Sequence, residues 1–310
     1  MIVTLTPNPA LDRTLIVPGF RHGDVTRVRE RHDAAGGKGL NVTRALHTLH
    51  APCLAIAPLG GPTGTTVAQL AAAEGLALQA IPIGGETRTC LSITDPAATD
   101  QLVINEPGPT ISATEWHTIH TAVQHACATA NWLTISGSLP PGVSPADLRT
   151  LIDAVPQRCA VAVDTSGAPL SACLDAPIAL LKINRDELAQ ALAATLSTEA
   201  ALVTAARSII ARGPRAVVVT LGANGALAII AAGAWHISAP TIVAVSPVGS
   251  GDCTLAGMVD ALARGATLPT AVAAGVGCGS ANALAPYAGV FLHADAVRFG
   301  AAATIRVIEA

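Results

Sequence analysis

Pro247-Val248-Gly249-Ser250-Gly251-Asp252 runs directly into an apolar segment, residues 253–262, in which hydrophobic side chains recur at helical spacing. The two glycines leave backbone N–H groups free to approach an anion at the N-terminus of this predicted helix. Asp252 adds a carboxylate that can accept the proton of a substrate hydroxyl. These are the minimal requirements for phosphoryl transfer to an alcohol. A simpler interpretation stays open, in which an ordinary loop precedes a helix whose dipole favours an acid in its first turn.

Four further stretches precede this one along the chain. They are Thr6-Pro7-Asn8-Pro9-Ala10-Leu11-Asp12, Gly36-Gly37-Lys38-Gly39-Leu40-Asn41-Val42, Gly137-Ser138-Leu139-Pro140-Pro141-Gly142 and Asn184-Arg185-Asp186-Glu187. In this order, and together with residues 247–252, they resemble the ribokinase-like (PfkB) carbohydrate kinases, most closely the branch of 1-phosphofructokinases and tagatose-6-phosphate kinases. The resemblance extends from Met1 to about Ala285 and includes both signature regions of that family.

The composition fits one large α/β domain and argues against a nucleic-acid partner. The chain has 310 residues, of which 51% are hydrophobic, and this is enough for a buried core. We expect a single domain that spans residues 1–310. The net charge of −3, with 18 lysines and arginines and no basic run, offers no electrostatic surface for nucleic acid. An aromatic content of 2% also leaves few rings on which bases could stack.

The seven cysteines are scattered and form no C-x-x-C pair, so we expect reduced thiols in a cytoplasmic protein. No basic segment followed by an apolar one is visible at the start, and no signal peptide is expected. Residues 216–236 carry no Asp, Glu, Lys or Arg, but Asn224-Gly225 in their middle is a strong hairpin signal. We therefore expect two buried strands there and no membrane span.

Short apolar runs alternate with segments of helical periodicity. The predicted strands cover residues 2–6, 53–57, 133–136, 160–164, 180–183 and 216–221, and the predicted helices cover residues 41–49, 65–74, 112–126, 144–154, 185–193, 199–212 and 253–264. Ser112 with Glu115, and Ser144 with Asp147, have the spacing of a helix-capping box. The alternation predicts an α/β fold with a doubly wound, mainly parallel sheet and helices on both faces.

Residues 13–33 and 87–105 depart from this alternation, because polar and apolar residues alternate along them as they do in extended strands. Turns are expected at Gly19 and at residues 95–98. By the resemblance, the two segments form a small β-sheet lid that closes over the sugar and often serves as a dimer clasp. The alternative is an ordinary antiparallel extension of the main sheet.

The resemblance assigns the chemistry to residues 249–252. Asp252 would be the catalytic base that takes the proton from the sugar hydroxyl. The backbone N–H groups of Gly249, Ser250 and Gly251 would form the anion hole for the transferred phosphate.

Cys253 stands where serine is usual in the family, and Pro247 stands where threonine is common. Neither supplies the base or the amides. No G-x-x-x-x-G-K-[ST], H-R-D or D-F-G sequence occurs, which argues against P-loop NTPases and protein kinases. A dinucleotide-binding fold is disfavoured because Thr254 takes the place of the third glycine.

ATP would meet the loop at residues 220–225, which resembles the nucleotide loop of the family. There Thr220, Gly222 and Gly225 approach the phosphates, and a hairpin turn at the same place is compatible with this role. Asn282, in a glycine-rich helix expected to begin near Ala271, is a nucleotide contact by the same resemblance. Without the resemblance it is an ordinary polar residue of a helix.

Asn184 and Glu187 match the N-x-x-E element, which in the family organises Mg2+ and its waters near the triphosphate. An amide and a carboxylate three residues apart at a helix start share one face, and Mg2+ keeps several waters. We therefore expect Glu187 to act through water, beside Asn184. Ile183 departs from the usual proline, and helix capping by Asn184 is the alternative.

The phosphate already on the sugar needs cations, and the candidates are Arg27, Lys38 and Arg88, with Ser138 as a further donor. A free surface position is the default for any basic residue. Lys38 differs because it lies between glycines, which let a point charge approach a ligand closely.

Sugar hydroxyls would be held, by the resemblance, by Asp12, Gly37 and Asn41. A short carboxylate and an amide suit polyol recognition, because a site that hydrogen-bonds a hydroxyl discriminates strongly against its absence.

Together these features predict an ATP-dependent, Mg2+-requiring phosphohexose kinase. Fructose 1-phosphate is the preferred substrate, giving fructose 1,6-bisphosphate, with tagatose 6-phosphate and then fructose 6-phosphate as alternatives. A non-catalytic sugar-phosphate sensor stays open, as does an oxidoreductase, which NAD rather than ATP would protect against melting. The expected partners are a phosphosugar and ATP, with neither nucleic acid nor membrane, and a homodimer through the lid.

Overall fold

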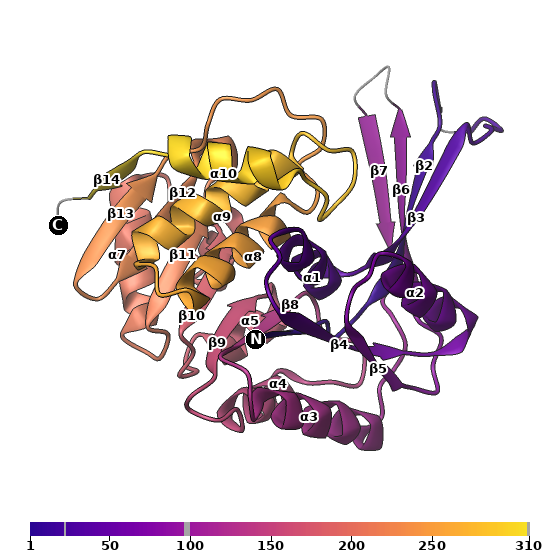
Figure 1. Ribbon diagram of the computed structural model, residues 1–310, viewed down its shortest axis with the longest axis horizontal. Helices are drawn as coiled ribbons and strands as arrows, with labels where there is room; N and C mark the ends of the chain where they lie inside the picture. The colour runs from indigo at the N-terminus through magenta and orange to yellow at the C-terminus, as the bar shows by residue number, and fades with distance from the viewer. Residues whose placement is uncertain (22, 96–99, 309–310) are drawn as a thin grey trace.

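The computed structural model describes residues 1–21, 23–95 and 100–308. The main body of the molecule is a ten-stranded sheet (Figure 1). Its strand order is β14-β13-β12-β11-β10-β9-β8-β1-β4-β5. The strands from β5 to β11 in this order are parallel, and β12, β13 and β14 are added antiparallel. Their bounds are β1 Ile2–Leu5, β4 Cys53–Leu59, β5 Leu78–Pro82, β8 Trp132–Ser136, β9 Ala160–Asp164, β10 Leu180–Asn184, β11 Ala216–Thr220, β12 Ala226–Ile230, β13 Gly233–Ile237 and β14 Ile305–Val307.

Helices cover both faces of this sheet, as the alternation predicts. One apolar cluster joins the sheet to α3 to α7, and a second joins its other face to α1, α8, α9 and α10. Central strands such as β1 are buried throughout, which explains their continuous apolar sequence. The bounds are α1 Lys38–Thr48, α2 Gly61–Ala73, α3 Ala113–Cys127, α4 Pro145–Asp153, α5 Ala168–Cys173, α6 Arg185–Ala191, α7 Glu199–Ile210, α8 Ser250–Ala263, α9 Leu268–Asn282 and α10 His293–Ala302.

A second, four-stranded sheet projects from the body beside α2 (Figure 1). Its order is β3-β2-β6-β7, with β2 and β6 parallel and the outer pairs antiparallel. The strands are β2 Ala10–Ile16, β3 Glu30–Gly36, β6 Arg88–Asp95 and β7 Asp100–Asn105. This small sheet, called the lid below, confirms the extended strands predicted for residues 13–33 and 87–105. Part of the turn predicted at residues 95–98 lies outside the described residues.

Most predicted elements are present, with boundaries moved by a few residues. Ser112 with Glu115 and Ser144 with Asp147 form the two predicted capping boxes. The hairpin differs in detail: a 3₁₀ turn, η1 Gly222–Asn224, joins the two strands. The Leu221 N–H donates to the Gly225 carbonyl across this loop, so the connection is longer than the two-residue turn that Asn-Gly favours.

Strands β5, β13 and β14 and helices α5 and α10 were not predicted. In α5, six residues are too few to show a periodicity. Within the described residues, no helix has the length and apolar character needed to cross a membrane.

Candidate active site

A large cavity of about 1800 Å³ lies between the lid and the carboxyl ends of the parallel strands. Asp164, Asn184 and Thr220 are the last residues of the neighbouring strands β9, β10 and β11, and all three line it. Asn184 pairs with Thr220 in register across β10 and β11. Ligands of open α/β sheets bind at this edge, because the strand ends deliver side chains from distant parts of the sequence to one place. Lid strands and the first turns of α1 and α8 complete the cavity wall.

The N-terminus of α8 opens into this cavity. Gly249 precedes the helix with φ +82°, a left-handed conformation that favours glycine. A Cβ at this position would lie 2.7 Å from the Ala288 Cα, so space as well as conformation requires glycine. In the described part of the chain, the Gly251 and Asp252 N–H groups have no hydrogen-bond acceptor, whereas the Ser250 N–H donates to the Pro247 carbonyl at 3.2 Å. The free N–H groups can bind an anion there.

Asp252, in the first turn of α8, has a buried side chain that nonetheless lines the cavity. Its Oδ2 accepts a hydrogen bond of 2.9 Å from the Asn41 Nδ2 on α1. Burial raises the pKa of Asp252 to about 7, and the nearby Asp164 carboxylate adds to this increase, while Lys38 opposes it. A carboxyl with a pKa near neutrality is suited to general-base catalysis.

Asp164 and Lys182 were not predicted, yet they form the charged centre of the site. The Lys182 Nζ lies 2.6 Å from one oxygen of the buried Asp164, and the Lys38 Nζ lies 3.3 Å from the other. Burial alone would raise the pKa of Asp164, but the two lysines hold it below its usual value. The Asp164 carboxylate in turn raises the pKa of Lys38, so the Lys38 ammonium group stays charged.

Lys38 is therefore placed differently from the prediction that it joins Arg88 at the phosphate of the sugar. Its ammonium group faces Asp164, and the charges of Asp252 and Glu187 also act on it. Lys38 therefore lies among the carboxylates of Asp164, Asp252 and Glu187. The glycines beside Lys38 do allow the close approach that the sequence suggested, but toward Asp164.

Asn184 and Glu187 line the cavity and also form a capping box at the start of α6. The Asn184 Oδ1 accepts from the Glu187 N–H at 2.8 Å, and the Glu187 carboxylate accepts from the Asn184 N–H at 3.0 Å. The capping alternative is thus observed. One Glu187 oxygen has no such contact in the described structure and can accept from a metal-bound water. Within the described residues, no group of three or more His, Cys, Asp or Glu side chains could hold a metal ion.

Thr220, Gly222 and Gly225 line the side of the cavity next to the loop at residues 239–248. Gly222 and Gly225 both have positive φ, and a Cβ on Gly225 would lie 1.9 Å from the Ile237 carbonyl oxygen. Gly225 is therefore required by the hairpin itself. Residues 239–246 of this loop were not singled out from the sequence, and Pro240, Ile242 and Val245 among them give this part of the cavity an apolar wall.

Asn282 does not line the cavity as predicted. Its side chain is fully buried and all its polar groups are used. Its Nδ2 donates to the Val248 carbonyl at 2.8 Å, and its Oδ1 accepts from the Gly289 N–H at 2.8 Å. Asn282 thus fixes the loop that precedes α8 instead of facing a nucleotide.

The opposite side of the cavity lies under the lid and contains Asp12, Gly37, Asn41, Arg88 and Ser138. Burial raises the pKa of Asp12, although a hydrogen bond from the Gly37 N–H opposes the rise. Arg88 donates to the Glu106 and Asn8 carbonyls, both at 2.9 Å, and its buried Nε has no partner in the described structure. The two carbonyls therefore hold the Arg88 side chain in place, and its Nε–H group can still donate a hydrogen bond.

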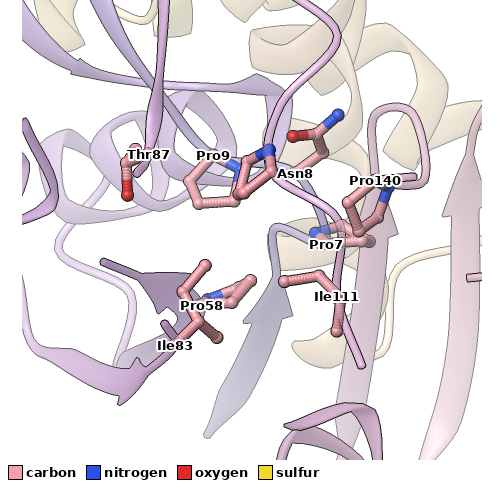
Figure 2. A pocket seen from close by; sticks show the side chains of 9 residues that line it. Pro7, Asn8, Pro9, Pro58, Ile83, Thr87, Ile111 and Pro140 are labelled. Carbon is pink, nitrogen blue, oxygen red and sulfur yellow. The ribbon is translucent and has the colours of Figure 1, made fainter. Parts of the chain in front are cut away.

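Asn8 was quoted in the sequence but not assigned a role, and it proves to be buried beside Ser138. Prolines surround the backbone on either side of it (Figure 2). Pro7, Pro9, Pro58 and Pro140 line one small hollow that has no space for a water molecule. Because proline fixes φ, this cluster gives the lid side of the cavity a rigid base.

Arg27 is not brought to the cavity. It lies in the exposed segment between β2 and β3 and is absent from the cavity lining formed by the described residues. The sequence offered no means to distinguish it from Arg88, because both lie in the predicted lid segments.

Comparison with known proteins is consistent with this geometry. The model of the pfkB family carbohydrate kinases matches residues 8–295. The chain is 34% identical over 301 residues to the ATP-dependent 6-phosphofructokinase isozyme 2 of Mycobacterium tuberculosis, covering 96% of this chain and 88% of that protein. It is 36% identical over 278 residues to the 1-phosphofructokinase of Haloferax volcanii, covering 89% of this chain and 88% of that protein.

Solved structures of other proteins are similar to this chain over nearly its whole length. Phosphofructokinase-2 from Escherichia coli in complex with potassium superposes with a TM-score of 0.92 at 32% identity, covering 97% of this chain and 98% of that one. Ribokinase from Thermotoga maritima gives a TM-score of 0.77 at 16% identity, covering 96% and 99%, and this likeness shows the fold alone.

Proposed function

This chain belongs to the pfkB family of carbohydrate kinases, and we propose that it transfers the γ-phosphate of ATP to a hexose that already carries a phosphate. Fructose 1-phosphate is the preferred substrate, giving fructose 1,6-bisphosphate. The observation that carries the proposal is Asp252, a buried carboxylate with a pKa near 7 beside free N–H groups at the start of α8. A base and an anion site next to each other are what transfer to an alcohol requires.

Asp252 accepts the proton of the attacking hydroxyl while the Gly251 and Asp252 N–H groups stabilise charge on the transferred phosphoryl group. Lys38 and Lys182 add positive charge at the same place without having to move. Asp12 and the Gly37 segment orient the sugar under the lid. Mg2+, when bound near Asn184 and Glu187, neutralises negative charge on the phosphates.

The phosphate of the sugar is assigned to Arg88 and Ser138. Arg88 is fixed by two backbone carbonyls and retains an unpartnered Nε at the lid side of the cavity. A planar guanidinium is well suited to phosphate because it donates in a fork geometry.

Asp252→Asn tests the base. We expect kcat to fall by about 10²-fold or more with nearly unchanged binding of ATP and sugar, since general-base catalysis contributes roughly 10²- to 10⁴-fold. Turnover close to wild type in the purified variant would remove Asp252 from the mechanism.

Arg88→Met and Lys38→Met test the two cations. We expect Arg88→Met to raise KM for the phosphosugar with little change in KM for ATP, and Lys38→Met chiefly to lower kcat, because its ammonium faces the reaction centre. A defect of Arg88→Met confined to ATP would reverse the assignment of the two ends of the cavity.

An ADP-release assay decides the substrate, with kcat/KM compared for fructose 1-phosphate, tagatose 6-phosphate, fructose 6-phosphate and fructose. Fructose 6-phosphate is the second candidate, because the chain is 34% identical to a 6-phosphofructokinase. The highest value with unphosphorylated fructose would contradict the proposal. No turnover of any sugar, with retained binding, would indicate a sugar-phosphate sensor.

We further propose that two copies associate through the lid. Leu102, Val103 and Ile104 on the edge strand β7 are all about half exposed, at 44%, 51% and 48%. An edge strand with apolar side chains is a favourable surface for pairing with another sheet. An E. coli phosphofructokinase-2 structure is described as a tetrameric inhibited form. Sedimentation equilibrium measures the association state here. The seven free cysteines fit a cytoplasmic location.

A further inference from the structure

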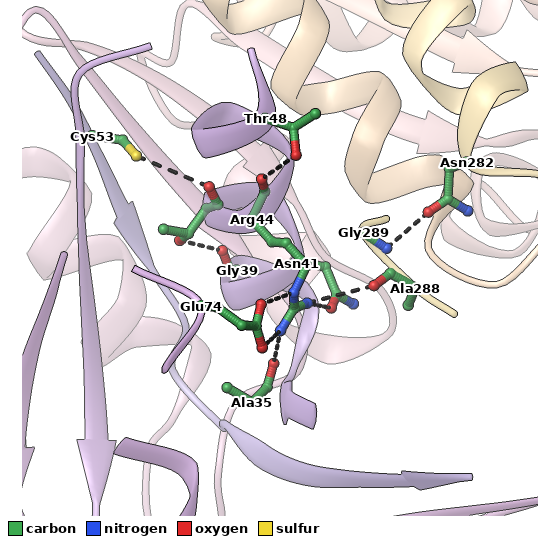
Figure 3. A network of polar contacts seen from close by, with 11 residues as sticks. Ala35, Gly39, Asn41, Arg44, Thr48, Cys53, Glu74, Asn282, Ala288 and Gly289 are labelled. Atoms are coloured by element: carbon green, nitrogen blue, oxygen red, sulfur yellow. Dashed lines mark hydrogen bonds and ion pairs between the residues drawn. The ribbon is translucent and has the colours of Figure 1, made fainter. Parts of the chain in front are cut away.

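Arg44 lies on α1, one turn beyond Asn41, and has no role in the function proposed so far. Its side chain is 8% exposed. The guanidinium contacts four groups in the described structure (Figure 3): the Asn41 Oδ1 at 3.0 Å, the Ala35 carbonyl at 2.7 Å, the Ala288 carbonyl at 3.5 Å and the Glu74 carboxylate. An arginine fork held by several acceptors has little freedom to rotate. Arg44 is thus fixed before any substrate binds.

The orientation of the Asn41 amide follows from its two neighbours. Arg44 donates to the Asn41 Oδ1, and the Asn41 Nδ2 donates to the Asp252 Oδ2 at 2.9 Å. A reversed amide would place its NH2 group against the guanidinium and its oxygen against the carboxylate. Both contacts would then be repulsive. Arg44 therefore keeps an N–H donor directed at Asp252.

We propose that Arg44 is a positioning residue for the catalytic base, acting through Asn41. By fixing the amide, it keeps the Asp252 carboxylate oriented and stabilised in the form that accepts a proton. The inference rests on the proposed function, because it requires Asp252 to be the base. Without Arg44, the amide can rotate when Asp252 becomes protonated. Its oxygen can then accept a hydrogen bond from the carboxylic acid, which stabilises the inactive form.

Arg44 can affect Asp252 chiefly through Asn41, which is hydrogen-bonded to both residues. The charged groups that face Asp252 are Lys38 on α1, Asp164 at the end of β9 and Lys182 on β10. Those that face Arg44 are Glu74 at the end of α2, Asp12 on β2 and the Cys253 thiol on α8. Substitution at Arg44 removes none of the groups around Asp252. A change in the titration of Asp252 would therefore report on the amide.

The test is the pH dependence of kcat at saturating substrates for Arg44→Met and Arg44→Lys. The acid limb is the part of the profile where kcat falls with decreasing pH. We expect it to move upward by about one pH unit in Arg44→Met, because the Asp252 carboxylate loses a fixed hydrogen-bond donor. At a pH below the limb, kcat should then be about tenfold lower than in the wild type. KM for ATP should stay within about twofold. Arg44→Lys keeps the charge and the pairing with Glu74 but cannot reproduce the fork, so its limb should move in the same direction. This second variant keeps the test valid if Arg44→Met does not fold.

Glu74→Gln is the matched control. It removes the ion-pair partner of Arg44 on the side away from Asn41 and leaves the contact between Arg44 and Asn41 in place. We expect lower stability but an unmoved acid limb. In an Asn41→Ala background, Arg44→Lys should cause no further shift.

An acid limb that stays in place in both Arg44 variants, or one that moves equally in Glu74→Gln, would overturn the inference. Loss of activity in Asp252→Asn alongside such a result would show that the proposed function stands and only the role of Arg44 fails. Full activity of Asp252→Asn would instead show that the proposed function fails.

Discussion

Two buried aspartates at the same site have pKa values that move in opposite directions. Burial disfavours the charged form of both Asp164 and Asp252. Two lysines contact Asp164 directly, so its carboxylate stays ionised. Asp252 receives one neutral hydrogen bond from Asn41 and faces the negative charge of Asp164, so its pKa rises to about 7. The two pKa values differ because the neighbouring charges differ. Asp164 keeps a fixed negative charge, whereas the proposed base Asp252 can accept a proton near neutral pH.

The pH dependence of kcat follows from this pKa. Asp252 must be deprotonated to accept a proton, so kcat should be high above pH 7 and fall about tenfold per unit as pH decreases below it. Initial rates at saturating ATP and sugar between pH 5 and 9 measure this.

The phosphate of the sugar itself titrates near pH 6, so kcat/KM contains a second ionisation. Measuring kcat under saturation isolates the bound enzyme. A kcat that stays constant from pH 5 to 8 would contradict this prediction, because the pKa of Asp252 in the bound enzyme would then lie well below about 7.

Sequence reasoning found the site residues that belong to contiguous motifs and missed the isolated ones. Gly249, Gly251 and Asp252 are recognisable because glycines and an acid adjoin an apolar helix. Asp164 and Lys182 are single polar residues in apolar strands, and only the parallel pairing of β9 with β10 brings them together. Arg44 lies on a predicted helix and was not singled out from the sequence. Its burial depends on β3, α2 and the loop after α9, which come from three separate parts of the chain.

At the scale of elements, the apolar periodicity predicted strands and long helices, but not how their ends are built. The start of α8 was predicted at residue 253, whereas the helix begins at Ser250. Glycines within the first turn conceal helical periodicity, and their role becomes visible only through Gly249 with its positive φ. The hairpin of β11 and β12 was likewise predicted from Asn-Gly, yet its loop also requires glycine at Gly225, because a Cβ there would lie 1.9 Å from the Ile237 carbonyl oxygen.

Gly249→Ala and Gly251→Ala form a matched pair at the start of α8. Alanine at Gly249 requires a strained left-handed backbone and a Cβ 2.7 Å from the Ala288 Cα. We expect this variant to lose about 1–3 kcal/mol of unfolding free energy and to bind ATP less well, because the loop must shift. At Gly251 the Cβ meets only the flexible end of Lys182, at 3.0 Å. The loss there should be smaller.

Urea denaturation of both variants, with and without an ATP analogue, measures these differences. Equal destabilisation by the two substitutions would contradict the specific requirement for glycine at Gly249.

At the scale of the whole molecule, the sequence predicted one domain with a main sheet and two extended segments outside it, and the structure adds the contacts between the two sheets. Polar alternation predicted the extended strands of residues 13–33 and 87–105, and the family resemblance predicted that they form a lid. The contacts between lid and body pair single residues from distant segments, so no pattern in the sequence signals them. One is the His32 ring on β3, which stacks on the Tyr287 ring in the loop after α9 with centroids 3.7 Å apart and planes inclined by 18°.

We predict that the lid closes over both substrates. The stack of His32 on Tyr287 lies at the cavity, where it can hold the lid against the body. We expect hydrogen exchange in β2, β3, β6 and β7 to slow when a phosphosugar and a non-hydrolysable ATP analogue are bound together, because closure excludes water from the reaction. Tyr287→Ala should reduce this protection and raise the fraction of ATP hydrolysed without sugar phosphorylation.

Tyr287→Phe keeps an aromatic ring at the same position and is the control, since stacking depends on the ring more than on the hydroxyl. It should behave like the wild type in both measurements. Exchange in the lid strands that is the same with and without ligands would argue against closure. Normal protection in Tyr287→Ala would place the contact that holds the lid elsewhere. Because uncoupled ATP hydrolysis and exchange are measured independently, agreement between them would tie the motion of the lid to the exclusion of water from the site.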